Sequence, residues 1–176
     1  MTVSVGDEAE IGSIQDLESI YKPASEQTLK SVLPYLHDFH FKYLSVAPIV
    51  FVGSCGTNGF RVVAQGGRAG IVQPLDRSAV AIPHLAGGRE FDTLRDLIED
   101  GRIAMLFVFP GLDVFMRING RAQVTRDPFL LRRLTGAGPA PVLATLVHVE
   151  AAYFHCGRAI NRSRMWDVKT HLTQAL

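Results

Sequence analysis

Arginines beside glycine-rich turns are the residues whose types and spacing best fit a binding chemistry. Arg68 lies within the run 66–70 (GGRAG), and Arg89 directly follows the glycine pair 87–88. Guanidinium groups and the backbone N–H donors of glycine turns together provide what a phosphate monoester needs. Alternatively, these arginines are solvated or pair with the carboxylates that follow Arg89. The residues alone leave both interpretations open. The other arginines of this candidate set are Arg61, Arg95, Arg158, Arg162 and Arg164.

Other reaction chemistries find less support in the sequence. His37 and His40 are three residues apart on an expected helix, but no carboxylate or second histidine pair joins them at ligand spacing. We therefore expect surface histidines and no metal site. Cys55 lies beside a turn without an identifiable base. The sequence contains no GxSxG, GxGxxG or Walker A motif, and it identifies no catalytic residue.

Length and composition are those of an ordinary soluble domain. Of the 176 residues, 47% are hydrophobic and 20% are charged, which predicts a single domain over residues 1–176 with a loose N-terminal segment at 1–12. The formal net charge of +1 argues against nucleic acid as a partner. No apolar stretch approaches the roughly 20 residues of a membrane helix. The acidic N-terminus lacks a signal pattern, so we expect a cytoplasmic protein that does not bind membranes.

The periodicity predicts a mainly β (α+β) fold with about six strands. Residues 114–125 alternate most clearly: Val114, Met116 and Ile118 point one way, and Arg117 and Asn119 the other. Residues 102–109 are apolar almost throughout, which predicts a strand buried on both faces. The other expected strands are 48–55, 60–65, 78–83 and 142–156, the first two joined by an Asn-Gly hairpin turn. Short helices are expected over 14–21, after Ser25, around 39–44, and over 91–98, 128–134 and 158–162. Such short strands favour closure into a barrel.

The run 82–125 and the tail 154–166 together resemble the FMN-binding split-barrel flavoproteins related to pyridoxamine 5'-phosphate oxidase. The segments 82–84 (IPH), 110–111 (PG), 117–122 (RINGRA) and 154–156 (FHC) align with motifs of that family. The resemblance covers about residues 25–167. It implies a six-stranded antiparallel split β-barrel with short flanking helices, and a homodimer with FMN at the interface.

The residues at the phosphate end depart from the family pattern. Gln65 stands where the family has an arginine, with Gly66 matching after it and Arg68 close by. Gly88 replaces an asparagine, and Glu90 replaces an arginine beside Arg89. The cofactor-binding residues that the resemblance implies are Gln65, Gly66, Arg68, Arg89, Arg95, Arg162, Ser163 and Trp166.

Two functions follow from this resemblance. The first is an FMN-dependent oxidoreductase that acts on a small-molecule substrate, which the sequence does not identify. The second is a split-barrel binding protein that has lost FMN or binds another ligand, such as a deazaflavin or haem. The replaced phosphate-end residues motivate the second.

Overall fold

The computed structural model describes residues 10–136 and 138–170. Its contacts divide the chain into two compact units, Met1–Ser31 and Val32–Leu176. The first unit contains α1 (Ile14–Ile20) and α2 (Glu26–Lys30), and neither helix has a buried residue. The predicted loose segment falls mainly on residues 1–9, which lie outside the described residues. A single domain over 1–176 stays a prediction.

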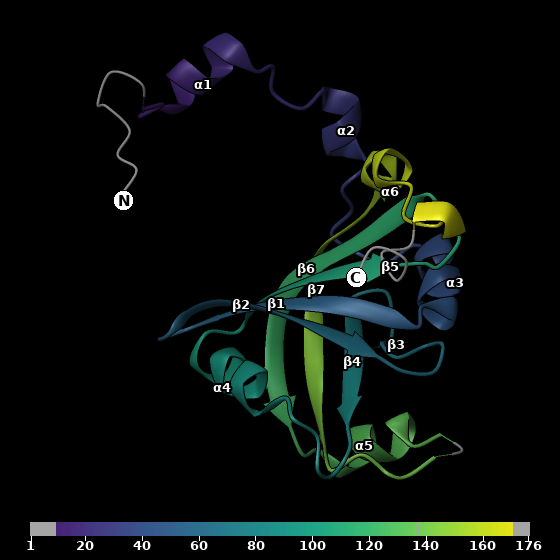
Figure 1. Ribbon diagram of the computed structural model, residues 1–176. Coiled ribbons are helices and arrows are strands. Elements are labelled where there is room, and N and C mark those ends of the chain that lie inside the picture. Colours follow the sequence, from purple (N-terminus) through teal and green to yellow (C-terminus); the bar gives the residue numbers. More distant parts are fainter. Residues whose placement is uncertain (1–9, 137, 171–176) are drawn as a thin grey trace, which may run out of the picture. The chain divides into compact units, whose positions relative to one another are not determined.

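The second unit is one antiparallel sheet with short helices around it (Figure 1). The strand order is β2-β1-β5-β6-β7-β4-β3, so that β2 and β3 are the edges. The elements are α3 (Asp38–Val46), β1 (Ile49–Gly56), β2 (Gly59–Gly66), β3 (Gln73–Pro74), β4 (Ala79–His84), α4 (Phe91–Glu99), β5 (Arg102–Val108), β6 (Val114–Thr125), α5 (Pro128–Leu134), β7 (Leu143–Cys156), α6 (Arg158–Ser163) and a 3-10 helix at Val168–Thr170.

The predicted fold class, mainly β with short flanking helices and a split barrel, is confirmed. The predicted number of six strands is wrong by one, because β3 forms a seventh strand against β4. This strand has only two residues. Two residues are too few to produce an alternating pattern, so sequence periodicity cannot reveal it.

The long pair β6 and β7 contains a β-bulge that keeps one face of β7 buried. Asn119 pairs with Ala151 and Gly120 with Val149, which leaves Glu150 as the extra residue on β7. Val149 is buried before the bulge and Ala152 after it. Because of the extra residue, the inward-facing positions change from odd-numbered at Val149 to even-numbered at Ala152, so the same face of the strand stays in the core. Gly120 is required there, because a Cβ would collide with the His148 carbonyl oxygen.

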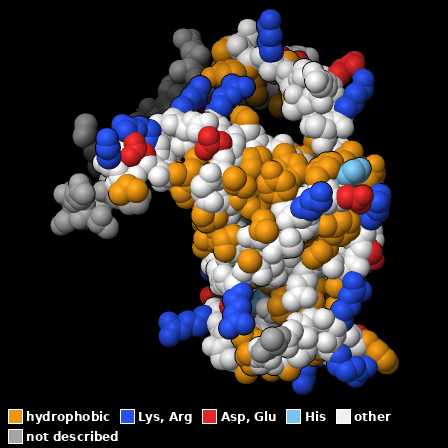
Figure 2. Space-filling view, turned by 90° about the vertical axis from the view of Figure 1, so that its right-hand side faces the viewer, with side chains coloured by type: hydrophobic (Ala, Val, Ile, Leu, Met, Phe, Trp, Pro, Cys, Tyr) orange, Lys and Arg blue, Asp and Glu red, His pale blue; other side chains and the backbone are white. Residues whose placement is uncertain are grey.

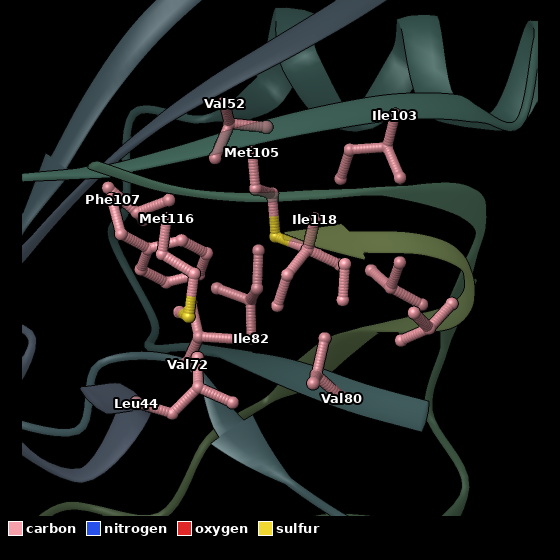
Figure 3. Close-up of a cluster of buried hydrophobic side chains, with 14 of the residues drawn as sticks. Leu44, Val52, Val72, Val80, Ile82, Ile103, Met105, Phe107, Met116 and Ile118 are labelled. Atoms are coloured by element: carbon pink, nitrogen blue, oxygen red, sulfur yellow. The ribbon is translucent and has the colours of Figure 1, made fainter. Parts of the chain in front are cut away.

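The inward faces of the strands form the hydrophobic core (Figure 3). Met105 and Phe107 of β5 point toward Met116 and Ile118 of β6, and all four are almost fully buried. The prediction that residues 102–109 are buried on both faces is wrong. Burial alternates along β5, and Arg102 is exposed. The strand belongs to a single curved sheet with only one face toward the core.

His40 corrects the expectation of surface histidines, since it is only 1% exposed. Its Nδ1 accepts a hydrogen bond from the His37 backbone N–H at 2.9 Å, at the start of α3. Its ring stacks on Phe154 of β7 with 5.2 Å between ring centroids. His40 thus joins the first turn of α3 to β7. Its Nε2 has no hydrogen-bond partner among the residues that the structure describes.

Among the described residues, no helix combines the length and apolar character that crossing a membrane requires.

Candidate functional site

A pocket of about 1010 Å³ lies at the split of the barrel. Its walls come from the end of β2 and the loop after it (63–71), from β4 and the loop after it (82–90), and from the segment around the α5–β7 connection. β2 and β3 are the two edges of the sheet, and Gln73 of β3 also lines the pocket. The pocket therefore occupies the place where the barrel does not close by strand pairing. Its volume suits a small-molecule ligand.

Two exposed arginines of this pocket are free to bind an anion. Arg68 comes from the β2–β3 loop and Arg89 from the β4–α4 loop. Neither forms a hydrogen bond or ion pair with another residue of the described chain. Glu90 also lines the pocket and contributes the opposite charge. With two cations and one carboxylate, the charged lining side chains sum to one positive charge.

The β2–β3 loop is held at both ends and open in between. Gly67 donates its backbone N–H to Pro48 O at 2.9 Å, and Gly70 donates to Ala47 O at 3.0 Å. Gly70 has a φ of 80°, a left-handed conformation that favours glycine. Between these anchors, the N–H groups of Arg68 and Ala69 have no partner within the described residues. A loop of this kind presents backbone donors to an anion.

His84, at the end of β4, forms part of the pocket wall. It is 6% exposed, and its Nε2 lies 2.9 Å from Thr145 Oγ1 of β7, which is fully buried. Burial lowers the pKa of His84, while the nearby Glu90 carboxylate acts in the opposite direction. Burial is the larger effect, so it favours the neutral form of the imidazole.

The structure brings together four of the eight candidate binding residues. These are Gln65, Gly66, Arg68 and Arg89, all of which line the pocket. Sequence reasoning did not select His84 as a binding residue. Its position at the end of a strand, directly before a glycine-rich turn, is the sequence feature that could have indicated it. Its place in the pocket wall depends on the packing of β4 against β7, which the sequence pattern does not show.

Arg95 does not line the pocket and belongs to an ion-pair cluster on α4. It lies 3.1 Å from Asp92 Oδ1 and 3.8 Å from Asp96 Oδ1. Asp96 is almost completely buried and also accepts hydrogen bonds from Arg61 Nε at 2.9 Å and Ser54 Oγ at 3.1 Å. These bonds hold α4 against the β1–β2 hairpin. The Arg61 guanidinium, first among several contacts, lowers the pKa of Asp96.

The candidate residues of the C-terminal segment also lie away from the pocket lining. Ser163 Oγ donates to Ile160 O at 3.0 Å within α6. Trp166 Nε1 donates to Leu112 O at 3.1 Å, which fixes the segment to the β5–β6 loop. Arg162 is exposed. Within one chain, Arg162, Ser163 and Trp166 are therefore separate from Arg68 and Arg89.

A second, smaller hollow of about 360 Å³ lies on the outer face of the sheet. Cys55, Phe60 and Val62 of the β1–β2 hairpin contribute to it, together with Arg102 and Glu150. Its charged groups are already paired: Arg102 with Asp100 at 2.5 Å and Glu150 with Arg121 at 3.5 Å. No group of three or more His, Cys, Asp or Glu side chains is placed to hold a metal ion within residues 10–136 and 138–170.

Comparisons with known proteins relate this chain to others through its fold. No protein-family model matches the sequence, and no curated protein matches it either. HupZ from Group A Streptococcus has a similar structure, with a TM-score of 0.53 and 16% identity over 65% of this chain and 90% of that one. A single-residue variant of HupZ gives a TM-score of 0.56, with 13% identity over 68% of this chain and 98% of that one.

A candidate pyridoxamine 5'-phosphate oxidase from Lactobacillus delbrueckii is similar to the same degree. Its TM-score is 0.54, with 13% identity over 69% of this chain and 95% of that one. At such identities the likeness concerns the fold. The arrangement of the sheet, with its split between the edge strands β2 and β3, agrees with these structural neighbours. The chain has the split-barrel fold of the pyridoxamine 5'-phosphate oxidase-like family.

Proposed function

We propose that this protein is an FMN-binding oxidoreductase whose pocket at the barrel split holds the flavin phosphate. The observation that carries the proposal is the pair of unpaired guanidinium groups, Arg68 and Arg89, on two loops of one pocket. A phosphate monoester carries about −1.5 to −2 charges at pH 7 and accepts several hydrogen bonds. Charge-assisted bonds from guanidinium groups are among the strongest that proteins form.

The remaining donors of the pocket fit the same group. The unpaired N–H groups of Arg68 and Ala69 supply backbone donors beside the guanidinium groups, as a phosphate requires. Gln65 at the end of β2 adds a side-chain amide to the lining. The flavin, when bound, would supply hydride transfer to or from a small-molecule substrate. The chain itself binds the phosphate and orients the ligand.

A homodimer is part of this proposal. Phe60 and Val62 are 88% and 72% exposed and lie on the same face of the edge strand β2. Exposed apolar side chains on an edge strand favour association with another chain. Hydrophobic side chains also gather over the middle of the face shown in Figure 2, with several Lys and Arg side chains in its lower half. In a dimer, Arg162, Ser163 and Trp166 of one subunit would lie near the flavin of the other.

The visible absorption spectrum of the purified protein tests the proposal. The protein should show flavin bands, either as purified or after incubation with excess FMN and desalting. The double variant Arg68→Ala/Arg89→Ala should retain much less flavin. Arg126→Ala provides a matched control, since Arg126 is an exposed arginine outside the pocket. Equal retention by all three proteins would exclude the assigned phosphate site.

One observation favours the second candidate function, a binding protein for another ligand. Glu90 lines the pocket with a negative charge, and Gln65 is neutral. Both weaken the attraction for a phosphate dianion relative to arginines at these positions. If the protein retains no FMN, binding of a deazaflavin or haem should be measured with the same spectra.

A further inference from the structure

His84 is the buried ionisable side chain of the pocket, and the arginine-based phosphate site does not explain it. A neutral, buried histidine usually has both ring nitrogens in hydrogen bonds or packed in the core. His84 uses one nitrogen, because Nε2 lies 2.9 Å from Thr145 Oγ1. The other nitrogen, Nδ1, forms no hydrogen bond with any described residue.

The free Nδ1 is nevertheless not enclosed by protein. The described chain has two buried side-chain nitrogens or oxygens without a partner, and they belong to His40 and Arg95. His84 is only 6% exposed, yet it lines the pocket. Its unpaired nitrogen is therefore not sealed off by protein, and the pocket is the open space that His84 lines, from which a ligand could complete its hydrogen bonds.

The charged side chains of the pocket come from two loops, and Glu90 is the one that acts on the His84 imidazole. Burial lowers the pKa of His84, and the carboxylate of Glu90 on the β4–α4 loop offsets part of this lowering. Arg89 lies on the same loop and Arg68 on the β2–β3 loop. The neighbouring β7 contributes the neutral Thr145, and α5 contributes the apolar Leu134. A bound phosphate would therefore add the largest negative charge near His84.

We propose that His84 is a third anion-binding group of this pocket, beside Arg68 and Arg89. When a phosphate monoester binds, the imidazole of His84 takes up one proton. The proton comes from solvent and bonds to the imidazole, so that both ring nitrogens carry hydrogen. Nε2–H then donates to Thr145 Oγ1, and Nδ1–H donates to a phosphate oxygen. The inference rests on the proposed phosphate site and adds proton-linked affinity to it.

The linkage has a definite sign. In the free protein, burial disfavours the charged form of His84 and lowers its pKa. A bound phosphate dianion favours the charged form and raises the pKa of His84. Between the free and the bound pKa, binding consumes protons, so the dissociation constant rises by up to tenfold per pH unit as the pH increases.

Calorimetric titration of the wild-type protein with FMN tests the proposal. Titrations at one pH in two buffers with different ionisation enthalpies give the number of protons taken up. The same titrations with inorganic phosphate test the site without the flavin ring. His84→Gln is the matched variant, since its amide can bond to Thr145 but does not titrate. Ionisation of the ligand phosphate contributes equally to the proton uptake of both proteins. The difference in proton uptake between wild type and variant therefore reports on His84 alone.

The four possible outcomes distinguish the failure of the flavin function from the failure of the role of His84. Proton uptake by the wild type that the variant lacks, with FMN, supports both the flavin site and the role of His84. If the wild type takes up a proton with inorganic phosphate and the variant does not, but FMN does not bind, the role of His84 is supported and the flavin function is contradicted. Binding of FMN with equal proton uptake in both proteins overturns the role of His84 and leaves the flavin function intact. Absence of binding by either ligand overturns both.

Histidine resonances of the wild type add a readout that does not depend on any variant. The imidazole signal of His84 should titrate at higher pH in the presence of saturating FMN or phosphate. An unchanged titration with bound ligand would contradict the proposal, even if His84→Gln fails to fold.

Discussion

The carboxylate of Glu90 folds back over Gly88, so that a Cβ at position 88 would overlap Glu90 Oε2. These two residues, with Gln65, are positions where the phosphate end departs from the pattern of the flavoproteins that the sequence resembles. The departures are coupled in space, because the absence of a side chain at position 88 provides the room that Glu90 occupies. Glu90 brings a negative charge to the rim of a pocket that also contains Arg68 and Arg89.

Glu90 should therefore weaken the binding of anionic ligands. We expect Glu90→Gln to tighten FMN binding by roughly 2- to 10-fold, as removal of one partly screened like charge would. Fluorescence titration of FMN measures the change. The advantage of the variant should shrink at high salt. A variant that binds FMN more weakly than wild type would show that Glu90 contacts the ligand favourably.

Arg68 and Arg89 should each contribute a charge-assisted bond to the phosphate. Loss of one such bond costs about 1.5–3 kcal/mol, so Arg68→Ala and Arg89→Ala should each weaken FMN binding about 10- to 150-fold. Arg95→Ala should have a much smaller effect, because Arg95 pairs with carboxylates of α4. A larger loss for Arg95→Ala than for Arg68→Ala would place the phosphate elsewhere.

His40 should make the fold sensitive to mild acid. Burial, followed by the charge of His37, lowers the pKa of His40 to about 4. The unfolded chain protonates this group near pH 6.5, so between pH 6.5 and 4 the unfolded state binds more protons. Stability should fall over this range by at most about 3 kcal/mol as the pH is lowered. Urea unfolding at several pH values measures the loss.

The control for this pH dependence is the exposed neighbour. His40→Leu should flatten the stability profile between pH 6.5 and 4, whereas His37→Gln should change it only slightly. Identical slopes in wild type and His40→Leu would assign the acid sensitivity to other groups.

Asp96 should be essential for the attachment of α4. Asp96→Ala would leave Ser54 and Arg61 without their buried acceptor, so we expect the melting temperature to fall by several degrees. Asp92→Ala is the matched control on the same helix, because Asp92 is 55% exposed and its ion pairs contribute little. Equal melting temperatures for the two variants would contradict this role of the Asp96 cluster.

The edge strand β2 should mediate dimerisation. We expect sedimentation to give about twice the chain mass of 19.3 kDa for the wild type and the chain mass for Phe60→Lys/Val62→Lys. The reason is the cost of burying two lysines in an apolar interface. Phe129→Lys is a control, because Phe129 is similarly exposed, at 74%, but lies on α5. A dimeric double variant would place the interface on another face.

The sequence by itself determined the long strands and the hairpin turn of the barrel, but not the two-residue strand β3. The alternation of residues 114–125 and the Asn-Gly turn between β1 and β2 depend on neighbours in the chain, and both appear in the structure as β6 and a hairpin. The glycines around Arg68 and before Arg89 likewise indicated two loops that could bind an anion. Such features are local, so residue order is sufficient to predict them.

The tertiary structure decided which side chains meet. Arg68 and Arg89 line one pocket because the loops after β2 and β4 come together there, beside the split between the edge strands β2 and β3. Arg95, another member of the candidate set, pairs with carboxylates of α4 instead, 3.1 Å from Asp92 Oδ1 and 3.8 Å from Asp96 Oδ1. His84 meets Thr145, a residue 61 positions further along the chain. Partner choice, burial and the resulting pKa of each group depend on long-range packing, which a periodic pattern in one sequence does not encode.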